Sequence, residues 1–148
     1  MLTSRDYTLD DLRKLVVETG RIGNPKHTYM FWGHIWIKAG RKALKDSELI
    51  HKGIHMVQED EINLVTMLIF LGIAMLTNLS IYMFFLGLLF ISIFWYTSLF
   101  FLFELFSVLI FKGKCNNPLE EEARINQKDI DYIRKRRVFA WFKYFKKS

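Results

Sequence analysis

Three side chains that can ligate a metal recur at helical spacing in the first half of the chain. His51, His55 and Glu59 follow one another at intervals of four residues, so they share one face of a helix. Two histidines at this spacing can bind zinc, and a glutamate can be the third ligand. Histidines that face solvent or a neighbouring protein are the alternative, and with Cys115 as the single cysteine no Cys-based site exists. We expect neither a metal nor another cofactor.

A second group with chemical potential is the carboxylate of Glu104, the only formal charge in residues 62–111. An ionisable group inside such an apolar segment can carry protons or couple ions. It follows Ile81 by 23 residues, about 34 Å along a straight helix, which places it near the far membrane surface. The alternative at that depth is that the Glu104 carboxylate pairs with a Lys or Arg of a partner protein or is hydrated by water.

The sequence contains no pattern typical of a common catalytic site. There is no Gly-rich phosphate loop, no Walker-type lysine and no Ser–His–Asp spacing, and no histidine lies within the apolar segment to ligate haem. We therefore expect no enzymatic activity and no small-molecule substrate.

The elements that position these groups are dominated by the apolar segment itself. Residues 62–111 are fifty long, whereas one bilayer crossing needs about twenty. A water-soluble domain of this size has too small a core to bury them. The polar, turn-forming Thr77–Ser80 divides the segment into spans Ile62–Thr77, about 24 Å long, and Ile81–Phe111, about 46 Å long. The sequence thus predicts an all-α membrane protein with a helical transmembrane hairpin, and a single very long span is the alternative.

The charges on either side of the hairpin predict its orientation. Residues 1–61 hold ten Lys/Arg, residues 112–148 hold eleven, and the turn near 77–80 holds none. Because positive residues remain on the cytoplasmic side, or the matrix side in a mitochondrion, both termini are expected there. Three segments result: amphipathic helices over 1–61, the hairpin over 62–111 and a basic, aromatic helical tail over 112–148.

The N-terminal segment shows helix signals at two places. Thr8 can cap a helix over Leu9–Thr19, with Asp11 as its capping-box partner and Gly20 ending it. A second helix is expected from about Ser47. Both carry apolar stripes that need a surface to pack on.

Between these helices lies a stretch rich in aromatic and basic residues. Trp32 and Trp36 stand among Tyr, Phe, Ile and Lys side chains over residues 29–42. Such a composition suits the membrane–water boundary, where Trp and Tyr lie at headgroup level. A contact surface for a neighbouring protein is the alternative, and the two can coexist.

The C-terminal tail begins with a helix signal and ends in basic and aromatic residues. Asn117 can cap a helix whose first residue is Pro118. Beyond it, seven Lys/Arg alternate with aromatic residues over 131–148, which suits an anionic lipid surface or grooves of partner subunits. Nucleic acid is the less favoured alternative. The residues expected to contact lipid or partner are Trp32, Trp36, Arg134, Lys135, Arg136, Arg137, Trp141 and Lys143.

Residues 9–53 resemble a small single-span accessory subunit of the distal membrane arm of mitochondrial complex I. A short helix over Leu9–Thr19 precedes the turn "IGNPKHTYMFW", in which Pro25 and Trp32 match the family's proline and downstream tryptophan. The later stretch "SELIHKGIHM" is similar to the family's Ser-Asp-apolar-apolar-aromatic-Lys-Gly pattern. Its matching positions are Ser47, Glu48, Lys52 and Gly53.

The chain also departs from this family. Asn24 and Lys26 replace the Asp and Trp that flank the family proline, acids occupy 59–61, and the second span and the tail have no counterpart. The resemblance implies a structural subunit and transfers no active-site residue.

Together these observations predict a non-catalytic accessory subunit of a mitochondrial inner-membrane respiratory complex, with both termini in the matrix. Its expected partners are other membrane subunits and an anionic lipid such as cardiolipin. A free membrane-shaping or lipid-binding hairpin of the endoplasmic reticulum is one alternative. A small proton- or ion-conducting element using Glu104 is another.

Overall fold

The computed structural model is mostly helical and forms two compact units. One unit combines residues 1–57 with 122–137, and the other combines 58–121 with 138–148. The sequence predicts three segments, 1–61, 62–111 and 112–148, from their expected positions relative to a membrane. This division stays a prediction. The structure describes residues 7–20, 28–31, 33–40, 42–77, 80–90, 98, 102 and 117–145.

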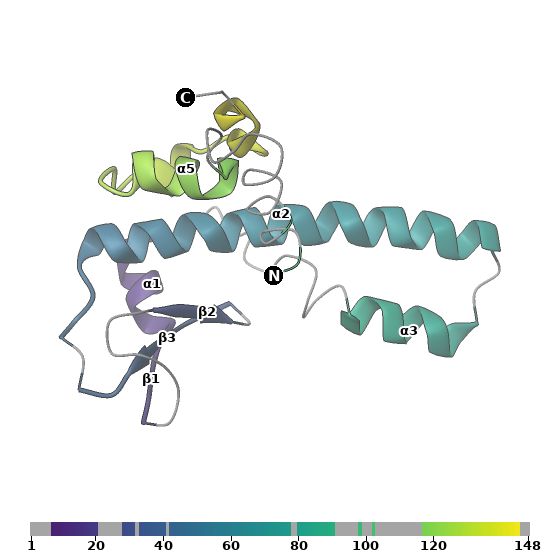
Figure 1. The fold of residues 1–148 in the computed structure, drawn as a ribbon, viewed down its shortest axis with the longest axis horizontal. Coiled ribbons are helices and arrows are strands. Elements are labelled where there is room, and N and C mark those ends of the chain that lie inside the picture. The colour runs from purple at the N-terminus through teal and green to yellow at the C-terminus, as the bar shows by residue number, and fades with distance from the viewer. Residues whose placement is uncertain are drawn as a thin grey trace. The chain divides into compact units, whose positions relative to one another are not determined.

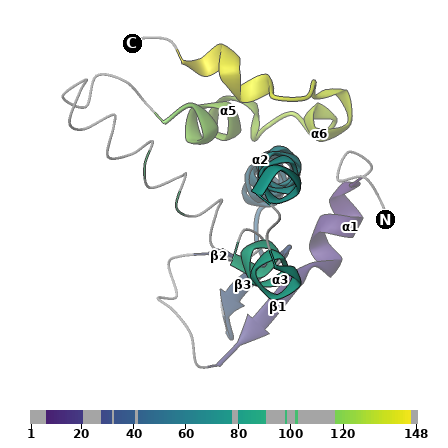
Figure 2. The same cartoon turned by 90° about the vertical axis from the view of Figure 1, so that its right-hand side faces the viewer.

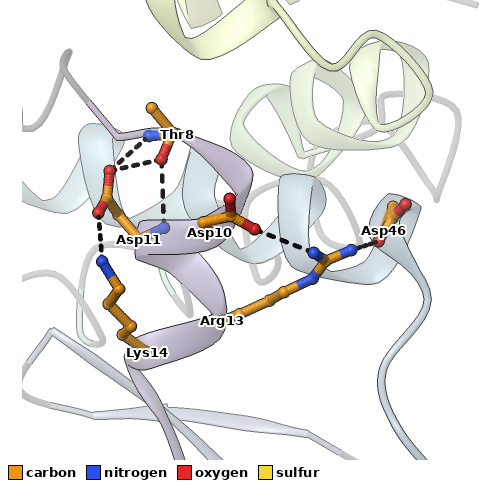
Figure 3. Close-up of polar contacts among 6 residues, drawn as sticks. All are labelled: Thr8, Asp10, Asp11, Arg13, Lys14 and Asp46. Atoms are coloured by element: carbon orange, nitrogen blue, oxygen red, sulfur yellow. Dashed lines mark hydrogen bonds and ion pairs between the residues drawn. The ribbon is translucent and has the colours of Figure 1, made fainter.

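The first helix, α1 (Leu9–Lys14), begins as the sequence predicts. The Thr8 hydroxyl accepts a hydrogen bond from the Asp11 backbone N–H at 3.3 Å, and the Asp11 carboxylate accepts one from the Thr8 N–H at 3.1 Å (Figure 3). This capping box satisfies donors that a helix end leaves open. The helix ends five residues before the expected Thr19, because a strand follows it.

An ion-pair bridge joins α1 to the start of the next helix, α2 (Asp46–Thr77). Arg13 donates to Asp10 at 3.0 Å and to Asp46 at 2.9 Å (Figure 3). All three side chains are at least half exposed, so the bridge contributes little free energy.

Three strands between Val16 and Lys38 form a sheet, so the all-α expectation is wrong. Its strands are β1 (Val16–Thr19), β2 (Tyr29–Phe31) and β3 (His34–Lys38), in the order β1-β3-β2. β1 pairs parallel to β3, with Val16 opposite Ile35, and β2 pairs antiparallel. Gly33, at φ 64°, makes the tight turn between β2 and β3.

Alternation along β3 explains why this stretch pairs as a sheet. Ile35 and Ile37 are buried, whereas His34 is exposed and Trp36 half-buried. This period of two is the signature of a strand with one face on a core. The amphipathic character expected of this stretch is real, but its buried face lies inside the protein.

The first part of α2 carries the core of the unit made from 1–57 and 122–137. Leu49 and Ile54 pack with Leu12 of α1 and Ile35 of β3. Gly53 permits the closest approach, because a Cβ there would lie 2.6 Å from Cδ1 of Ile133. Helix α2 begins one residue before the expected Ser47.

The other unit contains the end of α2 and helix α3 (Ile81–Phe90), which returns alongside it (Figures 1 and 2). The rings of Phe70 and Phe84 stack with centroids 5.7 Å apart, although fourteen residues of straight helix would separate them by about 21 Å. A Cβ at Gly87 would collide with the Phe70 ring. The chain therefore reverses between Thr77 and Ile81, where the turn was expected.

The C-terminal region contains α5 (Pro118–Asn126), α6 (Tyr132–Lys135) and the 3-10 helix η3 (Ala140–Tyr144). The side-chain oxygen of Asn117 accepts a hydrogen bond from the Leu119 N–H at 3.0 Å, so the predicted cap of α5 is confirmed. The tail is less helical than expected, since α6 spans four residues.

A buried ion pair joins α5 to the chain after α6. The Arg136 guanidinium donates to both oxygens of Glu122, at 2.6 and 3.1 Å. The Tyr132 hydroxyl donates to the same carboxylate at 2.9 Å. The charged side chains are 1% and 0% exposed, so each needs the other, because an uncompensated buried charge is costly.

We predict that Arg136→Ala lowers the free energy of unfolding by about 3–5 kcal/mol, because it leaves the Glu122 carboxylate buried without its cation. Arg136→Lys keeps the charge but loses the two-pronged geometry, so its effect is intermediate. Denaturant unfolding of the full chain in detergent micelles, followed by deuterium exchange of residues 118–137, measures both.

Arg137→Ala is the matched control, since Arg137 is exposed and its loss should change stability by less than about 0.5 kcal/mol. Joint replacement of Glu122 by Leu and Arg136 by Met should recover most of the loss. Equal stability of the Arg136→Ala and Arg137→Ala proteins would contradict the role of this pair.

Candidate membrane-contact surface

The second half of α2 leaves most of its large apolar side chains exposed. Only 11% of its most apolar 18-residue window is buried, and Leu76 is 85% exposed. A core helix of a soluble protein would be mostly covered. Among the described residues, α2 is the one helix long and apolar enough to cross a bilayer.

Helix α3 extends this apolar surface. Tyr82 is 83% exposed, and Phe85, Leu86 and Phe90 are also exposed. The helix buries only the face that carries Phe84 and Gly87 against Phe70. Its ten residues cover about 15 Å, too short to cross a bilayer, so the second span over 81–111 stays a prediction.

The threonine and serine hydroxyls of these segments bond locally, whereas the side-chain oxygen of Asn63 is buried without a hydrogen-bond partner among the described residues. The hydroxyl of Thr66 donates to the Ile62 carbonyl, and that of Thr77 to the Ile73 carbonyl, each at 2.8 Å. Ser80 caps α3, its hydroxyl accepting from the Met83 N–H at 3.4 Å. Such bonding within one segment is what a lipid environment demands, because lipid offers no hydrogen-bond partner.

A polar boundary precedes the apolar half of α2. Gln58 is fully buried and donates from its side-chain nitrogen to the Leu119 carbonyl at 3.0 Å, which ties α2 to the start of α5. Burial, reinforced by the neighbouring charge of Asp60, raises the pKa of Glu59 to about 7. The position at which α2 becomes apolar is therefore also one at which its charge can change near neutral pH.

The C-terminal segment gathers an aromatic cluster that belongs to the same unit as this helix end. Trp141 stacks on Phe142 with ring centroids 4.0 Å apart, and Phe139 packs edge-on against both. Phe139 has a φ of 53°, a left-handed conformation that a bulky residue adopts only when its surroundings hold it. Phe142 is 58% exposed, beside exposed Lys143.

The basic residues expected to bind lipid or partner have different environments. Arg134 and Arg137 are exposed, and Lys135 is exposed with an ion pair to Asp131 at 3.3 Å. Arg136 differs from the expectation, because it is buried against Glu122. A run of four basic residues in the sequence gives no sign of which one turns inward.

Of the two tryptophans expected at the membrane boundary, the structure describes only Trp36. Trp36 lies half-buried in β3, a strand of the folded sheet. Trp32 and Glu104 lie outside the described residues, so the partner contact of Trp32 and the ion-conducting role of Glu104 stay predictions.

The histidines at helical spacing do come together. The Nε2 atoms of His51 and His55 lie 3.2 Å apart, and their rings meet edge to face. Among the described residues, Glu59 does not belong to the group of side chains that could hold a metal ion together with these histidines. The third ligand expected from the sequence therefore stays apart.

No family model, curated protein or solved structure matches this chain. The resemblance of residues 9–53 to a complex I subunit stays a prediction.

We predict that Glu59→Gln stabilises the protein above neutral pH and not in acid. From pH 4.5, the ordinary pKa, to about 7 the folded protein holds a proton that the unfolded chain has released. Stability therefore falls as pH rises through this window, and the loss is complete above it. Thermal midpoints of both proteins in micelles, from pH 4.5 to 8, measure the difference.

Asp60→Asn is the matched variant, since it removes the neighbouring charge but not the burial of Glu59. It should reduce the pH dependence of the wild-type midpoint without abolishing it. A gap between Glu59→Gln and wild type that is the same at every pH would contradict the raised pKa.

Proposed function

We propose that this protein is a non-catalytic accessory subunit of a mitochondrial inner-membrane respiratory complex, and that the complex is complex I. The exposed apolar surface of α2 over 64–76 carries the proposal. At about 25 cal/mol per Å², this surface favours transfer out of water strongly. Lipid or the helices of neighbouring membrane subunits are what can cover it.

The folded unit on the N-terminal side supports a subunit rather than a simple anchor. It joins residues 1–57 to 122–137 through a shared core and the buried pair of Glu122 and Arg136. The chain on both sides of the apolar segment thus contributes to one folded body. This arrangement supports the proposal that both flanks lie on one side of the membrane, as a hairpin would place them.

The choice of parent complex depends on the resemblance. The matching residues 9–53 lie in α1, the sheet and the start of α2, so they fall within this folded unit. In the proposed arrangement the unit lies on the matrix face, and α2 and α3 pack against core membrane subunits. Small residues such as Gly72, with nothing within 4 Å of a Cβ there, leave room for a neighbouring helix.

A free lipid-binding hairpin is the second candidate, and the aromatic cluster of residues 139–145 favours it. Exposed Phe142 and Phe145 flank Lys143, a pattern that suits insertion at the headgroup level of an anionic membrane. Lipid contact by this cluster is compatible with both candidates. What distinguishes them is whether the chain exists apart from a complex.

The test is the migration of the native chain after extraction in a mild detergent. We expect the protein to run on a native gel only with a large assembly that contains complex I subunits. Migration at the size of one chain with its micelle would contradict the accessory-subunit proposal and support the free hairpin.

Gly72→Leu provides a matched variant for this experiment. It fills the open position on α2 without a clash inside the protein, so the isolated chain should keep its stability. We expect the variant to be depleted from the assembly if a neighbouring helix lies against Gly72. Lys128→Ala, at an exposed position outside the apolar segment, should assemble like the wild type.

A further inference from the structure

The pair of His51 and His55 has the geometry of a two-ligand chelate. Both imidazoles project from one helix, one turn apart, and their Nε2 atoms lie 3.2 Å apart. The ring centroids are 4.8 Å apart, with an angle of 77° between the ring planes. The two nitrogens are thus already close enough to contact one ion beside α2.

This separation matches what a tetrahedral zinc ion requires. Zn–N distances of about 2.0–2.1 Å place two nitrogen ligands roughly 3.3 Å apart. One ion can therefore reach both Nε2 atoms with almost no rearrangement. Because the helix fixes both side chains at their origin, little conformational entropy is lost on binding.

The surroundings hold this part of α2 in place. His55 is 5% exposed, and Ile54 beside it is fully buried in the core. His55 is therefore not a solvent-facing histidine, which was the alternative expected from the sequence. A hydrogen bond between the two rings engages one nitrogen of each, and a metal ion would use the same two atoms.

We propose that His51 and His55 bind one zinc ion through their Nε2 atoms, with oxygen donors such as water at the remaining positions. The motif reads "HKGIH", so Lys52 stands where zinc hydrolases of the H-E-x-x-H type carry their general base. Without a general base at this position, we assign the ion a role in stabilising α2 rather than in catalysis. This departs from the expectation that the protein holds no metal, and it does not depend on the proposed function.

Zinc titration of the purified full chain, after chelator treatment and in detergent, tests the proposal. We expect one zinc per chain and a thermal midpoint that rises by about 5 °C at saturating zinc. His51→Ala and His55→Ala should each weaken binding about 100-fold, because the second imidazole binds intramolecularly. X-ray absorption of the zinc complex should show two histidine nitrogens and the rest oxygen.

His34→Ala is the control, since His34 is exposed on β3, and it should bind zinc like the wild type. Circular dichroism of each variant measures its helix content and so separates lost binding from lost folding. Replacing His51 should disturb the fold less than replacing His55, because His51 is only half-buried. Absence of stoichiometric binding by the wild type overturns the proposal and leaves only a hydrogen-bonded pair. Wild-type binding by folded His51→Ala or His55→Ala also overturns it.

Discussion

Water cannot solvate the apolar half of α2 at low cost, and the rest of the structure is arranged around that constraint. From Leu64 to Leu76, α2 exposes leucine, isoleucine and methionine side chains. The hydroxyls of Thr66 and Thr77 bond back to the helix's own carbonyls, as segments in lipid must. Residues 58–61 are polar or charged and mark a boundary, beyond which α2 has the apolar composition of a candidate membrane span.

On the polar side of that boundary, separate parts of the sequence complete each other. Residues 1–57 contain strands and a short helix whose apolar faces meet α2, and residues 122–137 add Ala123 and Ile133 to the same core. The buried Glu122–Arg136 pair then fixes how the C-terminal part folds. The chain on either side of the apolar segment therefore contributes to one folded unit.

Local signals were predictable from the sequence, and pairings between distant residues were not. The caps at Thr8 and Asn117 and the end of α2 at Thr77 depend on a few adjacent residues, and all are found. The strands were missed because β1 is stabilised by β3, nineteen residues away. Arg136 was expected to contact lipid or a partner, and its burial opposite Glu122 could not be predicted because it depends on how α5 and α6 pack. The spacing of His51 and His55 was visible, but not that Glu59 stays apart.

The central claim is that the apolar half of α2 lies in a bilayer, and extraction of native membranes at alkaline pH tests it most directly. High pH strips proteins held by charge or by contact with other proteins, but leaves those whose apolar segments lie in lipid. We expect the chain to stay with the membrane pellet. We also expect an apolar photoreactive lipid probe to label residues 62–77. Release of the chain into the supernatant, with no label on α2, would contradict the central claim.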